Sequence, residues 1–383
     1  MEVKLTFADL PEWSDRRGLP YYEIVSEDVL TTAPRPLNPT EPREAVHYLR
    51  SRVYCGRLGQ CLQIGETSLF ATDDDCLIFY GMTHRDYDIW WYLQKETLHK
   101  AADFAVLDLA PPQFAVAEEC VYFGGSMNFG HFVFENLSRL AVLEQIDELH
   151  SLKLAVYHDL PSRFFEFLEL AGYGAERVIR IPRVRNIGFE NLWAPSCPFY
   201  RDVQSVPHVW PAAFHFLRWK ICSKLRADRT AGRPRLYLSR QGALQKRVVN
   251  EGEVVSYLLK EGFDVFEFSD LSAKEQLALI ANAEMIVGPI GAAMAVTVFA
   301  PEDCAVIELH PEAPIGGLYN SISQAHWLGQ PYQRVQGTRV LLPDNKVESA
   351  IFHDFSVDLR KLMMAVEEAK RCRFDERQLS EAL

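Results

Sequence analysis

The sequence predicts an α/β fold with parallel sheets, organised in two domains. Three short β-rich runs alternate with helical patterns between residues 235 and 311, which is typical of a parallel α/β unit. Residues 121–181 show the same β-α-β order. At 383 residues the chain is long for one hydrophobic core, so two domains are expected.

Composition indicates a globular protein and excludes one class of partner. The hydrophobic content is 48% and the aromatic content is 12%, which a disordered chain does not reach. The formal net charge of -12 argues against general nucleic-acid binding, because phosphate contacts need clustered lysines and arginines. We therefore expect no nucleic-acid partner, although a small local phosphate site is compatible with this charge.

The eight cysteines include no CxxC pair. We expect reduced, mostly buried thiols in a cytoplasmic protein and no zinc site. The N-terminus has no apolar signal core. The uncharged run at 285–301 contains three turn-forming residues, Gly288, Pro289 and Gly291, and is barely long enough to span a bilayer. We expect it to form a strand, a turn and a buried helix.

Residues 1–110 are predictable only in outline. Six prolines between positions 11 and 42 break any long element, and short β-rich pieces follow at 61–64 and 76–80. The three aspartates at 73–75 allow two interpretations. They could bind Mg²⁺ or Mn²⁺, or they could form a solvated turn between two strands, which the sequence favours.

The pattern becomes clearer from residue 120 onward. A strand is predicted at 121–123, a glycine-rich loop at 124–130 and a helix at 131–146. The sequence then predicts a strand at 153–157, a helix from Pro161 to about Ala171, and strands at 177–181 and 191–193.

The start of the predicted helix at 131–146 carries candidates for acid–base chemistry. His131 and Glu135 are four residues apart and share one helix face, and Arg139 lies one turn further along. Histidine titrates near neutral pH, and a carboxylate one turn away can orient its ring. The alternative is a pair on the helix surface without a special role.

The second domain is predicted to begin at residue 234, after a helix at 211–227 and a polar linker at 228–233. Its strands are predicted at 236–238, 265–268, 285–287 and 305–309. Asn250 with Glu253, and Ser272 with Glu275, have the spacing of helix-capping pairs. Apolar residues at helical spacing beyond residue 357 predict a terminal helix that packs back on the body.

Three strand ends of the second domain carry groups suited to a phosphate or sugar ligand. Ligands of parallel sheets bind beyond the carboxyl ends of the strands. Ser239 and Arg240 follow the first strand, and a guanidinium can donate to two diphosphate oxygens at once. The glycine turn at 288–291 could present N–H groups and a helix N-terminus to a phosphate. Glu308 and His310 belong to the last strand.

Each of these groups also has a structural interpretation. Arg240 could pair with an acidic neighbour at the surface, and the small residues at 288–291 could serve close packing of helix on strand. Glu308 lies on a strand that should be covered on both faces, so its carboxylate must accept hydrogen bonds. The donor could be a ribose or a protein side chain.

Taken together, these motifs resemble glycosyltransferase family 61, in its bacterial capsular-polysaccharide branch. The similarity covers roughly residues 122–337. It rests on Asn128-Phe129-Gly130-His131-Phe132 with Glu135 and Arg139; on Tyr237-Leu238-Ser239-Arg240 with Arg247, Asn250 and Glu251; on Glu275-Gln276; on Val287-Gly288-Pro289 with Gly291-Ala292; and on Val306-Ile307-Glu308-Leu309.

The resemblance implies a GT-B-like architecture, in which two Rossmann-like domains have a cleft between them. Residues 1–207, joined by a C-terminal helix at 354–383, would form the acceptor-side domain. Residues 208–233 would be the connecting helix and linker, and residues 234–353 the nucleotide-sugar-binding domain.

The resemblance also implies an inverting transfer of a sugar from a nucleotide sugar, of UDP type, to a saccharide or glycolipid acceptor. No metal or other cofactor would be needed. The enzyme would serve polysaccharide, capsule or lipopolysaccharide assembly in the cytoplasm, with peripheral association at the inner face of the membrane. The implied donor-binding residues are Ser239, Arg240, Arg247, Asn250, Gly288, Pro289, Gly291, Ala292 and Glu308, and the acceptor-side residues are Asn128, Gly130 and Arg139.

For the chemistry, we hypothesise that His131 or Glu135 is the general base and that Arg240 and Arg247 stabilise the leaving diphosphate. Two positions depart from the family pattern, because many members have His in place of Ile290 and Asn in place of Val296. A non-catalytic nucleotide- or glycan-binding protein of the same fold is therefore one alternative. A pyruvyl transferase or a sugar-nucleotide hydrolase on a doubly wound fold is another.

Overall fold

The computed structural model contains two compact units. The first comprises Met1–Leu30, His47–Met127 and His131–Ala213, and the second comprises Thr31–Val46, Asn128–Gly130 and Phe214–Leu383. The residues that the structure describes are 2–26, 28–32, 46–50, 52–65, 69–79, 97–101, 103–201, 207–223, 225, 233–242, 247–267, 270–312, 327–340 and 353–381.

Four neighbouring strands of the first unit form a parallel, doubly wound sheet. They are β11 (Cys120–Gly124), β12 (Lys153–Tyr157), β13 (Val178–Ile181) and β14 (Asn186–Pro195). Their order is β13-β12-β11-β14, and the three pairings are parallel. The chain winds outward from β11 to β13 and then returns to the other side of β11. The switch point therefore lies between β11 and β14, and the predicted β-α-β order is confirmed.

The connection from β11 to β12 is helical but is not one regular helix. It consists of α3 (Phe129–His131), the π-helical turn η1 (Phe132–Asn136), the 3-10 turn η2 (Leu137–Arg139) and α4 (Leu140–Leu143). The prediction of a single helix over 131–146 is thus wrong in its bounds and its regularity. Its inner face stacks on α5 (Ser162–Leu170), where the rings of Phe132 and Phe164 lie 4.3 Å apart.

Beyond β14 the same sheet continues with strands that the sequence predicts only in fragments, and these are paired antiparallel except for β7 with β1, which is parallel. β14 pairs antiparallel with β5 (Val53–Ile64), and the order continues β6-β7-β1-β9-β8. The remaining elements of this part are β1 (Glu2–Asp9), α1 (Leu10–Arg17), β2 (Tyr21–Val25), β6 (Leu69–Thr72), β7 (Cys76–Phe79), β8 (Thr97–Lys100), β9 (Phe104–Asp108) and β10 (Phe114–Val116). A separate four-stranded sheet contains β3 (Asp28–Thr32), β4 (Val46–Arg50), β15 (Phe199–Arg201) and β16 (Pro207–Val209).

The acidic run at 73–75 is the turn between β6 and β7. Asp73 forms an ion pair with Arg17 at 3.0 Å, and Asp74 accepts hydrogen bonds from Trp13 Nε1 and from Thr72 Oγ1 at 3.2 and 2.5 Å. The interpretation as a turn between two strands is therefore confirmed. Among the described residues, no group of three or more His, Cys, Asp or Glu side chains could hold a metal ion.

The second unit is built on a six-stranded sheet in the order β18-β17-β19-β20-β21-β22. Its strands are β17 (Arg235–Leu238), β18 (Phe263–Phe266), β19 (Met285–Pro289), β20 (Ala305–Pro311), β21 (Tyr332–Val340) and β22 (Asp354–Ser356). All pairings are parallel except that of β21 with β22. The chain starts at β17, places β18 on one side and β19 on the other, so the switch point lies between β17 and β19.

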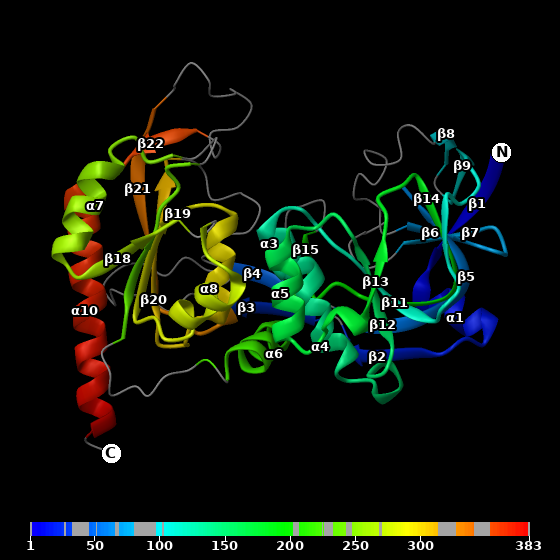
Figure 1. Cartoon of the computed structure of the whole chain (residues 1–383), viewed down its shortest axis with the longest axis horizontal. Helices are drawn as coiled ribbons and strands as arrows, with labels where there is room; N and C mark the ends of the chain where they lie inside the picture. The colour runs from blue at the N-terminus through cyan, green and yellow to red at the C-terminus, as the bar shows by residue number, and fades with distance from the viewer. Residues whose placement is uncertain are drawn as a thin grey trace. The chain divides into compact units, whose positions relative to one another are not determined.

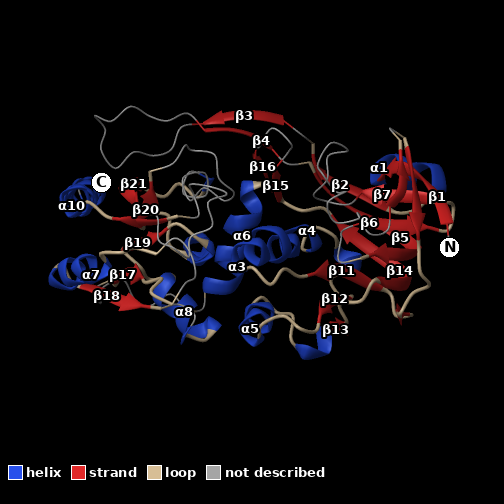
Figure 2. Ribbon diagram, turned by 90° about the horizontal axis from the view of Figure 1, so that it is seen from above, coloured by secondary structure: helices blue, strands red, loops and turns tan. Residues whose placement is uncertain are grey.

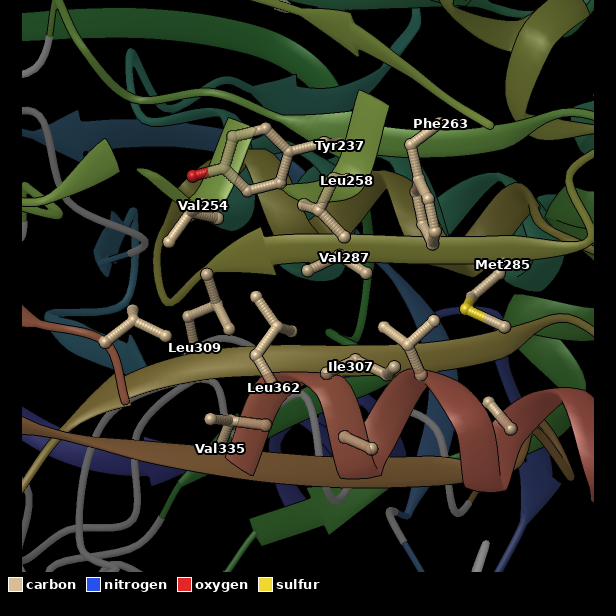
Figure 3. Close-up of a cluster of buried hydrophobic side chains, with 14 of the residues drawn as sticks. Tyr237, Val254, Leu258, Phe263, Met285, Val287, Ile307, Leu309, Val335 and Leu362 are labelled. Carbon is tan, nitrogen blue, oxygen red and sulfur yellow. The ribbon is translucent and has the colours of Figure 1, made fainter. Parts of the chain in front are cut away.

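Helices α7 (Glu251–Lys260) and α10 (Leu359–Glu381) cover one face of this sheet, and α8 (Ala273–Ile280) covers the other (Figures 1 and 2). Leu258 of α7 and Leu362 of α10 belong to one buried cluster with Tyr237, Val287 and Ile307 (Figure 3). Ser272 and Glu275 form the predicted capping box at the start of α8. Asn250 is the N-cap residue of α7, but its side chain makes no capping hydrogen bond to the backbone and instead donates from Nδ2 to Glu253 Oε2 at 3.3 Å.

The C-terminal helix belongs to the second unit, and its predicted association with the first domain is wrong. Leu362, Ala365, Val366 and Ala369 of α10 are fully buried in the cluster of the six-stranded sheet. Their helical spacing forms an apolar stripe. This stripe packs on β20 and β21, on the same face of the sheet as α7.

The uncharged run at 285–301 forms β19 and a buried 3-10 helix, η6 (Ala292–Phe299), as the sequence predicts. No helix within the described part of the chain is long and apolar enough to cross a membrane. The seven cysteines whose side chains are described are buried free thiols. Helix α6 (Pro211–Cys222) ends five residues earlier than predicted, and the unit boundary falls within it.

Replacing Asp74 by Asn should make the protein less sensitive to acid. Burial raises the pKa of Asp74, but the hydrogen bonds from Thr72 and Trp13 and the charge of Arg17 outweigh it, so the pKa lies below its usual 3.8. A lowered pKa means that the ionised form stabilises the fold above the unfolded-state pKa. That contribution is lost as the pH falls through the folded-state pKa.

Urea unfolding at about pH 7 and at steps below about pH 4 measures this effect. The free energy of unfolding of the wild type should converge on that of Asp74→Asn as the pH falls. Asp103→Asn, at an exposed position of the same unit, is the matched control. A pH-independent difference for Asp74→Asn would contradict the assignment.

Candidate functional site

The chain leaves β11 through two consecutive glycines in conformations that favour glycine over residues with a side chain. Gly124 and Gly125 have φ angles of 66° and 131°, in the left-handed region that favours glycine. A Cβ atom would lie 2.8 Å from Tyr122 Oη at position 124 and 2.6 Å from Leu160 Cδ1 at position 125. These two glycines begin the loop that leads from β11 into the helical segment.

The residues after this turn start the helical segment at the switch point of the first sheet. Asn128 Oδ1 accepts the backbone N–H of Gly130 at 2.9 Å, which holds the start of α3. The next turn, η1, is π-helical, and single π turns within helices are frequent at functional sites. In η1 the N–H of Leu137 bonds to the carbonyl of Phe132, five residues back.

The candidate acid–base pair lies on the first two turns of this segment. His131 Nδ1 and Glu135 Oε1 are 2.5 Å apart. The His131 side chain is 32% exposed and that of Glu135 is 10% exposed. The more exposed imidazole can therefore reach a ligand, while the more buried carboxylate holds the ring in place. This is the arrangement of a positioned general base.

Arg139 and Asn136 anchor the π turn to β11 instead of facing solvent. The carbonyl oxygen of Phe123 accepts a hydrogen bond from each of them, at 3.1 Å in both cases. Asn136 Oδ1 also accepts the backbone N–H of Ser126 at 3.0 Å. Because Arg139 is only 2% exposed, its position supports the geometry of the pair rather than direct contact with a large acceptor.

Two further residues shape this turn, and the sequence did not identify either. Cys197 follows β14 and donates from Sγ to the carbonyl oxygens of Phe199 and Glu135, at 2.7 and 3.5 Å. Burial, opposed by the charge of Arg139, raises the pKa of this thiol to about 12, so it stays protonated and can donate. Ser138 Oγ donates to the carbonyl of Phe134 at 2.5 Å.

In the second unit, two of the predicted residues meet at the switch point between β17 and β19. Arg240 follows the end of β17, and Gly291 follows the end of β19. A Cβ atom at position 291 would collide with the guanidinium of Arg240, so the glycine allows the arginine to lie over the turn.

The first glycine of this turn serves packing. A Cβ atom at Gly288 would lie 2.8 Å from Met294 Sδ and 3.1 Å from Leu238 Cβ, so the glycine lets η6 approach the strands closely. Pro289 ends β19 in register with Leu309. At position 288 the glycine thus serves close packing, whereas at position 291 it leaves space for the side chain of Arg240.

The loop that carries Ser239 and Arg240 is held by a buried carboxylate. Glu251, the first residue of α7, accepts hydrogen bonds from Tyr237 Oη at 2.9 Å and from the backbone N–H of Arg240 at 3.4 Å. Burial lowers the pKa of Arg240, and Glu251 opposes that shift. Ser239 Oγ accepts the N–H of Gln241 at 3.3 Å.

Arg247 and Asn250 are engaged in links to the C-terminal part of the chain. Arg247 donates to the fully buried Asp354 from Nε and Nη2, at 2.9 and 2.6 Å, and from its backbone N at 2.7 Å. The Asn250 side chain exchanges two hydrogen bonds with the backbone of Val357, at 3.0 and 2.8 Å. Both residues bind the segment that leads into α10. Their predicted role in binding a nucleotide-sugar donor stays a prediction.

Glu308 has a protein partner. Its side chain is buried, and Oε2 accepts a hydrogen bond from Tyr332 Oη at 2.7 Å. Of the two interpretations from the sequence, this contact supports the protein partner, and contact with a nucleoside stays a prediction. His310 is also buried, with Nδ1 2.5 Å from the Pro311 carbonyl oxygen.

The two positions that depart from the family pattern are core positions. Ile290 is 3% exposed and Val296 is 0% exposed. The backbone N–H of Ile290 donates to Leu309 O at 2.8 Å, which extends the pairing of β19 with β20. The apolar side chains therefore fill the interior of the second unit next to the Gly288–Gly291 turn.

Comparison with known proteins gives one family match. Residues 129–307 match the sequence model of the family Glycosyltransferase 61. The matched segment covers just under half of the chain and includes the helical segment after β11 and the turns after β17 and β19. It supports the predicted relationship to that family.

Two solved structures are also similar to the chain, each at 12% identity. The E. coli ADP-heptose lps heptosyltransferase II has a TM-score of 0.33, with 67% of this chain and 99% of that chain covered. The dodecameric iron-containing heptosyltransferase TibC in complex with ADP-D-beta-D-heptose has a TM-score of 0.30, with 91% and 98% covered. These scores are too low to support a conclusion about fold or function. No curated protein sequence matches the chain.

Replacing Arg247 by Ala should mainly destabilise the second unit. Asp354 would lose its charged partner while remaining buried, and breaking a buried ion pair costs roughly 3 kcal/mol. Urea unfolding measures the loss, and Arg360→Ala, at an exposed arginine of α10, is the matched control. A variant of normal stability that no longer binds nucleoside diphosphates would instead identify Arg247 as a ligand of the diphosphate.

Proposed function

We propose that the chain is an inverting glycosyltransferase that moves a sugar from a nucleotide sugar to a saccharide acceptor. The observation that carries this proposal is the family match to residues 129–307, which includes both clusters of candidate residues. One cluster offers a positioned base, and the other offers a partly buried guanidinium at a topological switch point. These are the two groups that such a transfer requires.

The donor half of the reaction would use Arg240. As the bond between the anomeric carbon and the diphosphate oxygen breaks, negative charge builds up on the leaving nucleoside diphosphate. A partly buried guanidinium stabilises this charge more strongly than one in water, because the local dielectric is lower. Ser239 and the turn at Gly291 and Ala292 are proposed as neighbouring contacts. We propose a UDP-type donor and no requirement for a metal.

The acceptor half would use the His131–Glu135 pair. The acceptor hydroxyl oxygen would attack the anomeric carbon from the side opposite the diphosphate, which inverts the configuration. The hydroxyl proton would pass to the imidazole. If the Nδ1–H donates to Glu135, then Nε2 is the basic nitrogen, and the carboxylate stabilises the imidazolium that forms.

The wider role is also a proposal. Saccharide or glycolipid acceptors in capsule or lipopolysaccharide assembly, at the cytoplasmic face of the membrane, agree with the family resemblance of the motifs. Binding of nucleotides without any transfer would instead indicate a non-catalytic member of the fold. Ile290 and Val296 would then be the first positions to test by substitution.

A thermal-shift screen against nucleoside diphosphates and nucleotide sugars, with EDTA or Mn²⁺, tests the donor site. A ligand at about 100 times its dissociation constant should stabilise the protein by about 2.7 kcal/mol. The shift should be insensitive to EDTA and should be clearly smaller, but still measurable, in Arg240→Ala, whose turnover should fall by more than ~100-fold. Arg360→Ala is the control. The absence of any shift with the wild type would contradict the proposed function.

Substitutions at the acid–base pair test the acceptor half. His131→Gln should lower turnover by roughly 10²–10⁴-fold, the range expected for loss of a general base, without weakening nucleoside diphosphate binding. Glu135→Gln should lower turnover less, because the imidazole remains. His150→Gln, at an exposed histidine of the same unit, is the control and should have the turnover of the wild type. Wild-type turnover of both His131→Gln and Glu135→Gln would exclude the pair from the mechanism.

A further inference from the structure

We infer that Glu251 is a positioning residue for Arg240, so that its carboxylate sets the affinity of the site for a diphosphate. This inference rests on the proposed function, because it assigns Glu251 a role in the same donor site. Glu251 does not itself face the ligand, since its side chain is only 5% exposed. Its effect would be exerted through the loop that it holds.

One oxygen of Glu251, at the start of α7, links this helix by hydrogen bonds to the end of β17 and to the residues that follow it. Oε1 accepts from Tyr237 on β17, at 2.9 Å, and from the backbone N–H of Arg240, at 3.4 Å. An ionised carboxylate only accepts hydrogen bonds, so both neighbours must donate. The backbone of Arg240 is therefore held at a fixed distance from the start of α7.

The opposite side of Arg240 is bounded by the turn after β19. A side chain at Gly291 would collide with the guanidinium. Two features therefore define the position of the Arg240 guanidinium: Glu251 holds its backbone, and Gly291, which has no side chain, leaves space for it. A buried cation also costs less free energy when an anion lies nearby, and Glu251 provides that charge.

A purely structural role for Glu251 predicts a different outcome. An acidic residue in the first turn of a helix stabilises the helix through its dipole, and a buried carboxylate stabilises its hydrogen-bonded neighbours. Loss of these interactions would lower stability but would not act through Arg240. If Glu251 acts by positioning Arg240, the effects of substituting the two residues on ligand affinity should be coupled. A purely structural role of Glu251 predicts no such coupling.

The experiment is a double-mutant cycle on UDP binding, measured by isothermal titration calorimetry on the full chain. Glu251→Gln keeps the shape and an acceptor oxygen but removes the charge. It should weaken UDP binding about tenfold, within the range of energies for coupled neighbours. In the Arg240→Ala background the same substitution should change affinity by less than about twofold. Asp264→Asn, an exposed carboxylate of the same unit, should leave affinity unchanged.

The outcomes separate this inference from the function on which it rests. If the wild type binds neither UDP nor inorganic pyrophosphate, the proposed function and the inference both fail. If the wild type binds UDP but Glu251→Gln has no effect, or has an equal effect with and without Arg240, only the inference fails. Should Glu251→Gln not fold, Glu251→Asp completes the cycle, because it keeps the charge but withdraws the oxygen from the Arg240 N–H.

Discussion

The reversal of strand order in each parallel sheet is the constraint on which both candidate clusters depend. In the second unit, α7, which follows β17, covers one face of the sheet (Figure 1), and η6, which follows β19, packs next to α8, which covers the other face. Two neighbouring loops that diverge in this way leave room at the carboxyl ends of the strands. Arg240 and Gly291 lie at this point. In the first unit the corresponding point, between β11 and β14, is flanked by the helical segment of His131 and by Cys197.

Irregular backbone distinguishes the candidate site at the helical segment after β11. The left-handed glycines 124 and 125 and the π turn at 132–136 are local departures from regular structure, and each needs support from elsewhere in the chain. Asn136, Arg139 and Cys197 supply that support with hydrogen bonds to main-chain carbonyls. A surface pair without a special role would not require so many buried polar contacts beneath it.

The sequence predicts those features whose determinants are local. The strands at 153–157 and 236–238, the capping box at Ser272 and the strand–turn–helix at 285–301 are confirmed because each depends on neighbouring residues. The strands before residue 110 were not predicted as a sheet, since the pairings that join them, such as β1 with β7 and β9 and β5 with β14, connect residues distant in sequence. The same reason explains the contacts of Arg247 with Asp354 and of Asn250 with Val357, each 107 residues apart. The π turn was missed because its residues keep ordinary helical periodicity.

The buried carboxylates of the second unit divide its arginines into two kinds. Asp354 binds the guanidinium of Arg247 directly, through both Nε and Nη2, so the two charges largely cancel at contact. Glu251 binds the backbone amide of Arg240 and the hydroxyl of Tyr237, so its charge lies behind the arginine. A diphosphate approaching Arg247 would have to displace Asp354 and leave that carboxylate buried without its cation, which is unfavourable. This difference agrees with the proposal that Arg240 is the cation of the donor site, whereas the contacts of Arg247 hold the segment that leads into α10.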